Sequence, residues 1–192
     1  MSYGTAKNLT ANGFTKTGHY FTGWNTKSDG SGTKYSNQQS VKNLTTTNGA
    51  TVNLYAQWSP YKLKVSFNAN GGSVDSITYY LSSKVVYKES DSSKYIQTWT
   101  YNNTKDNGIT NASTFGLYRT GYTFSSWGTS SSGGTIFSQS DNTLKPTDLN
   151  SGIKTGNVSM TLYAQWSPIT YTINFNGNGY TSGSTSSMSM TY

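Results

Sequence analysis

One heptapeptide occurs twice in this chain and constrains its fold more than any other feature. The sequence LYAQWSP spans residues 54–60 and again residues 162–168, so that Leu54 and Leu162 are 108 residues apart. Each copy leads directly into a matching segment, YKLKVSFNANGG from residue 61 and ITYTINFNGNGY from residue 169. A repeat of this kind indicates a chain built from similar structural modules.

A second repeated pair precedes the first and fixes the order of the parts. TGHYFTGWNTKSDGSGT begins at residue 17 and TGYTFSSWGTSSSGGT at residue 120, and both run through aromatic residues to a tryptophan and a Gly/Ser turn. This order predicts three parts. They are the later half of a module in residues 1–58, a complete module in residues 61–166 with an insert near residues 84–114, and the early half of the next module in residues 169–192.

The segment after each heptapeptide alternates strictly between apolar and polar residues, as a half-buried strand does. In the first copy the apolar face carries Tyr61, Leu63, Val65 and Phe67, with Lys62, Lys64 and Ser66 opposite. In the second copy the apolar face carries Ile169, Tyr171, Ile173 and Phe175. An Asn-Gly pair follows each strand, at residues 70–71 and 178–179, and predicts a tight turn.

Other segments give weaker secondary-structure patterns. QTWTY around Trp99 alternates as well, so we expect the insert to add a strand or a hairpin. Helical periodicity is poor throughout, and SNQQSVKNLT from Ser36 is the best candidate for one or two helical turns.

Composition favours a stiff β protein with thin cores built on aromatic residues. Apolar residues make up 32% of the chain, and 16 tyrosines, 5 tryptophans and 7 phenylalanines carry much of that share. The chain has no cysteine, which excludes a disulfide and a thiolate metal site. No apolar run is long enough to span a bilayer, so we predict no membrane insertion. A signal peptide and an anchor are not recognisable in this chain.

The net charge is +7, from 14 basic and 7 acidic residues. Arginine is the preferred reader of bases and phosphates, and Arg119 is the only arginine in the sequence. We therefore expect no nucleic-acid partner, and we expect the lysines to keep strand faces and edges soluble.

The titratable residues do not form a catalytic pattern. His19 is the only histidine, and it stands where the second copy has Tyr122, which predicts an aromatic position in a strand. The seven acidic residues are scattered, and SDGSG at residues 28–32 lacks the later acidic ligands of a calcium loop. We predict no catalytic residue, no cofactor and no metal site.

Ligand binding is the alternative to a structural role. Tyr55 and Tyr163 lie on the strand face opposite Leu54, where tyrosines either stack on sugars or form cross-strand pairs. With Lys62 and Lys64 they are the candidate ligand-facing residues, for a surface glycan or an anionic polymer.

The two half-modules predict a self-assembly site, because each carries apolar residues that need a covering sheet. The early half contributes Ile169, Tyr171, Ile173, Phe175, Met188, Met190 and Tyr192. The later half contributes Tyr3, Leu9, Phe14, Phe21, Trp24, Leu54 and Trp58. Met190-Thr191-Tyr192 also matches Met1-Ser2-Tyr3, which implies a period of 189 residues from Tyr3 to Tyr192.

Three arrangements would complete the half-modules. The chain is a slice of a longer polypeptide, or separate subunits donate strands to one another head to tail, or one chain closes on itself. Closure is the least favoured, because a rod-like middle module would hold the two ends apart. A head-to-tail contact that does not close grows a filament, so the expected partner is a neighbouring copy.

At GHYFTGWNTKSDGSGTKYS, LYAQW and VSFNANGG the sequence resembles the Listeria–Bacteroides repeat family, the internalin-type B repeats. The resemblance covers nearly all of the chain outside residues 84–114. It implies small β-grasp-like modules, with parallel first and last strands and no established catalytic residues, in tandem on bacterial surface or secreted proteins. We therefore expect a mainly β chain of such modules with little or no helix, arranged as a rod, that serves as a structural unit at the bacterial cell surface or outside the cell.

Overall fold

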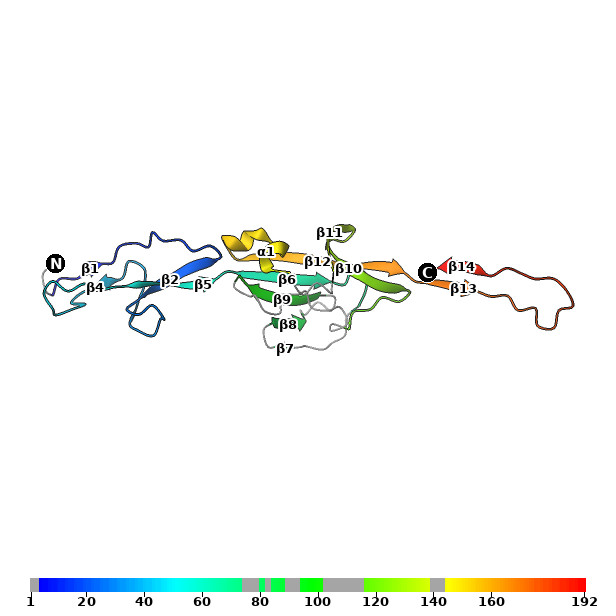
Figure 1. The fold of residues 1–192 in the computed structure, drawn as a ribbon, viewed down its shortest axis with the longest axis horizontal. Coiled ribbons are helices and arrows are strands. Elements are labelled where there is room, and N and C mark those ends of the chain that lie inside the picture. Colours follow the sequence, from blue (N-terminus) through cyan, green and yellow to red (C-terminus); the bar gives the residue numbers. More distant parts are fainter. Residues whose placement is uncertain (1–3, 74–79, 82–83, 89–93, 102–115, 139–143) are drawn as a thin grey trace. The chain divides into compact units, whose positions relative to one another are not determined.

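Strands dominate the computed structural model of this chain, which describes residues 4–73, 80–81, 84–88, 94–101, 116–138 and 144–192 (Figure 1). In these residues the helical elements are the α-helix α1 (Pro146–Leu149) and the 3-10 helix η2 (Ser151–Lys154). The prediction of a mainly β fold is confirmed.

The chain forms two compact units. The first unit comprises residues 1–63, 100–103 and 146–158, and the second comprises residues 64–99, 104–145 and 159–192. Each unit therefore unites segments that lie far apart in the sequence.

The first unit contains two small antiparallel sheets. The larger has the strand order β3-β2-β5, and the smaller pairs β1 with β4. Their bounds are β1 (Lys7–Asn8), β2 (His19–Asn25), β3 (Lys34–Tyr35), β4 (Ser40–Val41) and β5 (Tyr55–Pro60). Among the described residues, β5 is an edge strand whose only sheet neighbour is β2.

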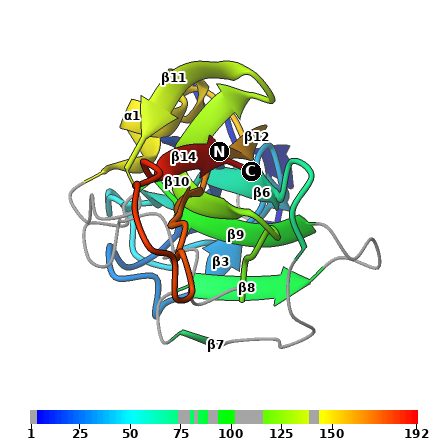
Figure 2. The same ribbon diagram turned by 90° about the vertical axis from the view of Figure 1, so that its right-hand side faces the viewer.

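Most of a seven-stranded sheet lies in the second unit, with the order β11-β10-β12-β6-β9-β8-β7. The strands β9, β8 and β7 follow one another towards one edge in Figure 2. Strand β6 lies inside the sheet, between β12 and β9. The bounds are β6 (Lys62–Asn68), β7 (Tyr80–Leu81), β8 (Lys84–Lys88), β9 (Lys94–Thr100), β10 (Tyr122–Ser130), β11 (Gly133–Phe137) and β12 (Val158–Pro168). The expectation that the insert adds strands is confirmed by β8 and β9.

Strands β6 and β12 run parallel. Near the start of both, the Lys62 backbone N–H donates a hydrogen bond to Asn157 Oδ1 at 2.8 Å. Near their ends, the Trp166 Nε1–H donates one to the Ala69 carbonyl at 2.9 Å. The contacts advance along both strands in the same direction, which is the parallel arrangement, and the two arrows agree in Figure 1.

Burial along β6 follows the predicted alternation. Leu63, Val65 and Phe67 are at most 1% exposed, whereas Lys62 and Lys64 are exposed. The neighbouring strands add Trp99, Trp127, Leu162 and Ala164 to the buried set. The core therefore consists of a few aliphatic side chains around large aromatic ones.

The last two strands, β13 (Thr170–Ile173) and β14 (Met188–Thr191), form a separate antiparallel hairpin. The turn that follows β13 repeats the turn that follows β6. Asn70 and Asn178 have φ values of 48° and 44°, and Gly71 and Gly179 have values of 83° and 91°. Two consecutive positive φ angles in an Asn-Gly pair characterise a type I′ turn, so both predicted turns are confirmed.

The expected helical turn from Ser36 is wrong. The segment contains a turn at residues 37–38 followed by β4, and Gln38 and Asn43 adopt φ values of 56° and 52°, which a right-handed helix does not accommodate. The helix instead begins at Pro146 in the second copy, where proline presets the backbone angle of the first helical turn.

Phe67 and Phe175 occupy the same place in the repeat but differ in burial, at 1% and 52% exposed. We expect Phe67→Ala to lower the free energy of unfolding by about 3–5 kcal/mol, because it leaves a cavity in the core. Phe175→Ala should change it by less than about 0.5 kcal/mol, as exposed substitutions do. Urea denaturation at low protein concentration measures both. Equal losses in the two variants would contradict the assigned core.

Candidate functional site

The two copies of the aromatic segment pair with LYAQW in the same register. Phe21 of β2 lies opposite Trp58 of β5, and Phe124 of β10 lies opposite Trp166 of β12. In both pairs the register shifts just after the phenylalanine, as it does at a β-bulge. The repeated sequence thus forms a repeated structure, and each position has a counterpart in the other copy.

Each copy gathers three aromatic rings beside this bulge. The Phe21 ring centroid lies 5.1 Å from that of Trp24 and 5.7 Å from that of Trp58. The second copy repeats the cluster at 5.1 Å and 5.9 Å with Phe124, Trp127 and Trp166. The predicted residues Phe21, Trp24 and Trp58 are therefore in contact, in the inclined geometry that aromatic pairs prefer.

A fourth ring covers the cluster in the second copy. Phe67 of β6 lies 4.9 Å from Trp127, which is 1% exposed. In the first copy Trp24 contacts Phe14 at 6.2 Å, but Phe14 is 63% exposed and Trp24 remains half-buried. The first copy therefore has aromatic surface that a strand of the β6 type covers in the second.

The same contrast holds along LYAQW. Leu162 and Ala164 of β12 are fully buried, whereas Leu54 and Ala56 beside or within β5 are half-buried. Strand β12 is covered on its second edge by β6, and β5 has no second strand neighbour in the described part of the chain.

The β13–β14 hairpin has the complementary deficiency, because among the described strands it lacks a neighbour equivalent to β12. Tyr171 lies opposite Met190, and Ile173 lies opposite Met188. The apolar residues of the hairpin are exposed by 36–60%, namely Ile169, Tyr171, Phe175, Met188, Met190 and Tyr192, and Ile173 is half-buried. The counterparts of Tyr171, Ile173, Phe175 and Met190 are Leu63, Val65, Phe67 and Trp99, and all four are buried. The structure therefore gathers the predicted early-half residues on one hairpin; their role in assembly stays a prediction.

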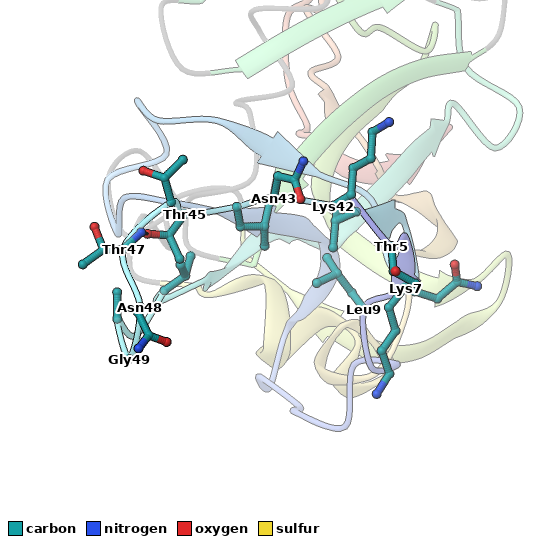
Figure 3. Close-up of a pocket in the computed structure, with 15 residues that line it drawn as sticks. Thr5, Lys7, Leu9, Lys42, Asn43, Thr45, Thr47, Asn48 and Gly49 are labelled. Atoms are coloured by element: carbon teal, nitrogen blue, oxygen red, sulfur yellow. The ribbon is translucent and has the colours of Figure 1, made fainter. Parts of the chain in front are cut away.

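A groove of about 620 Å³ lies beside β1, β4 and residues 42–50 of the first unit (Figure 3). Its apolar wall includes Leu9, Val41, Leu44 and Val52, and the Lys7 and Lys42 side chains point outwards at its rim. Of the predicted later-half residues, Leu9 lines this groove, and Tyr3 lies outside the described residues.

A glycine packs against a tyrosine ring at the start of each aromatic segment. Gly18 has a φ of +73°, and a Cβ at this position would overlap the Tyr101 ring. Gly121 has a φ of +78°, and a Cβ there would overlap the Tyr192 ring. The adjacent rings repeat the match, since His19 lies 5.7 Å from Tyr101 and Tyr122 lies 5.8 Å from Tyr192. His19 thus occupies the predicted aromatic position.

Backbone hydrogen bonds around these glycines are also repeated. The Tyr61 N–H donates to the Gly18 carbonyl at 2.8 Å, and the Tyr101 N–H donates to the Tyr61 carbonyl at 2.9 Å. The second copy has the same two bonds, at 2.9 Å and 3.0 Å, among Gly121, Ile169 and Tyr192. Tyr192 is therefore the counterpart of Tyr101, and Met190 that of Trp99.

Sequence reasoning missed the Gly18–Tyr101 contact, although the Thr-Gly before each aromatic segment and the Thr-Tyr at residues 100–101 and 191–192 were available signals. In the first unit the Gly18 N–H also donates to the Lys154 carbonyl at 2.7 Å. This bond ties the aromatic segment to η2.

Asn70 is a second residue that the sequence analysis passed over except as a turn former. Its Nδ2 donates to the Ala164 carbonyl of β12 and to the Ser131 carbonyl, both at 2.8 Å. The Asn70 N–H is held in turn by Asn68 Oδ1 at 2.8 Å. The side chain thus links the turn after β6 to β12.

The candidate ligand-facing residues lie on separate elements. Tyr55 is 42% exposed at the start of β5 and opposite Asn25, whereas Tyr163 is half-buried in β12 and opposite Gly128. Lys62 and Lys64 are exposed on β6. A glycan-binding role for them stays a prediction.

A different groove in the first unit combines aromatic and basic side chains. It measures about 400 Å³, and its lining includes Phe14, Tyr20 and Tyr61 together with Lys16 and Lys154. The Tyr20 and Tyr61 rings lie 5.7 Å apart and are both accessible to some extent. The groove has no acidic residue in its lining.

The described residues contain no group of three or more metal-ligating side chains. Asp29, in the SDGSG turn, accepts a hydrogen bond from the Ser31 N–H at 2.9 Å, and this bond together with the Ser31 hydroxyl lowers the pKa of its carboxyl group. Arg119 stacks on Tyr122, with its guanidinium carbon 3.8 Å from the ring centroid. In the described part of the chain, no helix has the length and apolarity needed to cross a bilayer.

Gly18→Ala tests the glycine–tyrosine contact, and Gly49→Ala is its matched control. Gly49 has a φ of +72°, nearly that of Gly18, but open space where the Cβ would be. Both variants bear the left-handed backbone cost of about 1–2 kcal/mol. Gly18→Ala should lose about 1–3 kcal/mol more, because the methyl group displaces the Tyr101 ring. Thermal denaturation compares the two variants. Equal melting temperatures would show that the Tyr101 ring does not restrict the side chain at position 18.

The comparisons with known proteins agree with the repeated architecture. A protein of Evansella cellulosilytica described as "Putative Gly-rich membrane protein" is 31% identical over 164 residues. The match covers 85% of this chain and 16% of that relative, so the chain spans about one sixth of its length. No solved structure matches the chain. The sequence model of the Listeria-Bacteroides repeat domain matches residues 1–57. Residues 1–57 of the chain are thus similar to the Listeria-Bacteroides repeat domain.

Proposed function

We propose that this chain is a structural repeat unit of a bacterial surface protein or filament, in which neighbouring copies complete one another's modules head to tail. One observation carries the proposal. The β13–β14 hairpin exposes apolar side chains whose counterparts in β6 and β9 form the core of the second unit.

The exposed surface gives association a driving force. Full burial of a large apolar side chain contributes about 1.5–3 kcal/mol, and the hairpin has six that are at least one third exposed. The half-buried Leu54, Ala56 and Trp24 provide the matching surface in the first unit. Because the two surfaces differ, their contact is heterologous, and such contacts extend into chains unless rotation closes them.

Placement at the cell surface rests on the family and on the relative. Residues 1–57 match a repeat family, and the relative is described by its name as a membrane protein. A structural role, without catalysis, accords with side chains that are used in packing and turns, such as His19 against Tyr101.

Size-exclusion chromatography with light scattering tests the proposal. We expect a concentration-dependent series of species above 20.9 kDa, the mass of one chain. Deletion of residues 169–192 should abolish the series, because it removes the exposed hairpin. The circular dichroism melt of the truncated chain serves as a control for folding. A single 20.9 kDa species at all concentrations would refute assembly by this chain.

A second candidate function is the binding of an anionic glycan, and the groove lined by Phe14, Tyr20 and Tyr61 favours it. Aromatic faces stack on sugar rings, and Lys16 and Lys154 supply positive charge without an acidic residue in the lining. Charge interactions at such an open site weaken with salt.

Calorimetric titration with a sulfated heparin tetrasaccharide tests this second function, with neutral maltotetraose as the control sugar. We expect binding of the sulfated sugar alone, weakened about tenfold or more by Lys16→Gln with Lys154→Gln and by raised salt. The matched variant, Lys7→Gln with Lys42→Gln, removes the same charge from the other groove and should bind normally. Equal loss in both variants would point to net charge rather than to this groove.

A further inference from the structure

We propose that β13 of one copy pairs in parallel with β5 of its neighbour, in the register of β6 and β12, and that Phe175 and Asn178 specify this seam. The inference rests on the proposed head-to-tail assembly and names the contact that forms it. The partner is a second copy of this chain, presenting LYAQW at residues 54–58.

The first argument is the identity of the open edges. Strand β12 lies between β10 and β6, and β5 is its counterpart with β2 in the place of β10. Strand β6 lies between β12 and β9, and β13 is its counterpart with β14 in the place of β9. Among the described residues, β5 therefore lacks a neighbour equivalent to β6, and β13 lacks a neighbour equivalent to β12. Addition of a strand at such an edge supplies backbone hydrogen bonds and side-chain pockets together.

The second argument is that, in the described residues, the face of Trp24 has no covering ring equivalent to the one that Phe67 provides for Trp127. In the second unit, Phe67 packs on Trp127 at 4.9 Å. Phe175 is the counterpart of Phe67, and Trp24 is the counterpart of Trp127. Phe175 is 52% exposed and Trp24 is half-buried, so an aromatic contact between them would remove apolar surface of both rings from water.

The third argument is the amide of Asn178. Its turn is already formed as in the second unit, with its N–H bonded to Asn176 Oδ1 at 2.9 Å. In the described structure its Nδ2 makes no hydrogen bond, whereas that of Asn70 donates to Ala164. The counterpart of Ala164 is Ala56 in β5. The seam therefore places Asn178 Nδ2 against the Ala56 carbonyl of the neighbour.

The two turns differ at two positions, Ala69 against Gly177 and Gly72 against Tyr180, and the seam adapts to both. Gly72 has no room for a Cβ, which would overlap Trp166, yet its counterpart is Tyr180. Tyr180 folds over Gly177, in the space where Ala69 carries its methyl group. The alanine and glycine of one turn are thus exchanged for a glycine and a tyrosine in the other. Trp166 donates a hydrogen bond to the Ala69 carbonyl beside Gly72. Because Tyr180 stands where Gly72 does, the proposed seam includes no equivalent hydrogen bond from Trp58.

Single substitutions test the two specifying residues in the full chain. Phe175→Ala removes the ring, and Asn178→Asp replaces the amide donor by an acceptor while an Asn-like side chain keeps the turn. Each should raise the concentration needed for half-maximal assembly by about tenfold or more in light scattering. Asn174→Asp, with the same charge change on the opposite face of the hairpin, should assemble like the parent. Unchanged assembly by Phe175→Ala and Asn178→Asp would overturn the seam.

Cross-linking tests the register, because the chain has no cysteine of its own. Ala56→Cys and Asn178→Cys are made as separate chains. Because the cysteine at position 178 lacks the amide, the two chains are mixed at a concentration well above that at which Asn178→Asp assembles. They are then treated with a short bis-maleimide, which forms a thioether with each of two thiols. We expect a cross-linked dimer from the mixture and little from either variant alone. A second pairing, Thr172→Cys with Ala56→Cys, is the out-of-register control and should not link.

The outcomes separate the inference from the proposed function. If the parent chain does not assemble at all, the proposed function fails and the seam fails with it. If the parent assembles but the mixture gives no more cross-linked dimer than the single variants, the copies join elsewhere, and only the seam is wrong.

Discussion

The parallel pairing of β6 with β12 is the contact on which the core of the second unit depends. It brings Phe67 onto Trp127, encloses Leu162 and Ala164, and is fastened at its ends by the side chains of Asn157, Asn70 and Trp166. Antiparallel neighbours such as β10 and β12 form from nearby sequence and recur in both copies. The parallel partner decides whether the aromatic cluster is buried, as at Trp127, or half-open, as at Trp24.

The two repeated copies are joined by a very short connection. Strand β5 ends at Pro60 and β6 begins at Lys62, so the LYAQW strand of the first copy leads at once into the strand that pairs with the LYAQW strand of the second. The Tyr61 N–H bonds back to Gly18, and Tyr101 then bonds to Tyr61. Two successive backbone hydrogen bonds thus hold the junction, and a tyrosine ring packs against a glycine with a positive φ. The recurrence of this arrangement at Gly121, Ile169 and Tyr192 makes it a property of the repeat.

Much of the fold could be predicted, because alternation reports directly on which strand face is buried. Leu63, Val65 and Phe67 follow their pattern, and the Asn-Gly pairs form the expected turns. The helix was misplaced, since Pro146 and not the polar segment after Ser36 starts one. The glycine–tyrosine contacts and the hydrogen bonds donated by the Asn70 side-chain amide were missed. They join residues that are 61 to 94 positions apart, such as Asn70 with Ser131 and with Ala164, and strand periodicity carries no information about such pairs.

The same strand pairing has different consequences within a chain and between chains. Strands β6 and β12 are held in one polypeptide, so the effective concentration of one for the other is high. A pairing of β13 with a neighbouring β5 lacks that advantage unless the copies are joined, and Tyr180 in place of Gly72 alters its packing further. The inner module would therefore remain folded at dilutions at which a seam between copies opens. If copies assemble as proposed, the hairpin would pair only where neighbouring chains are concentrated.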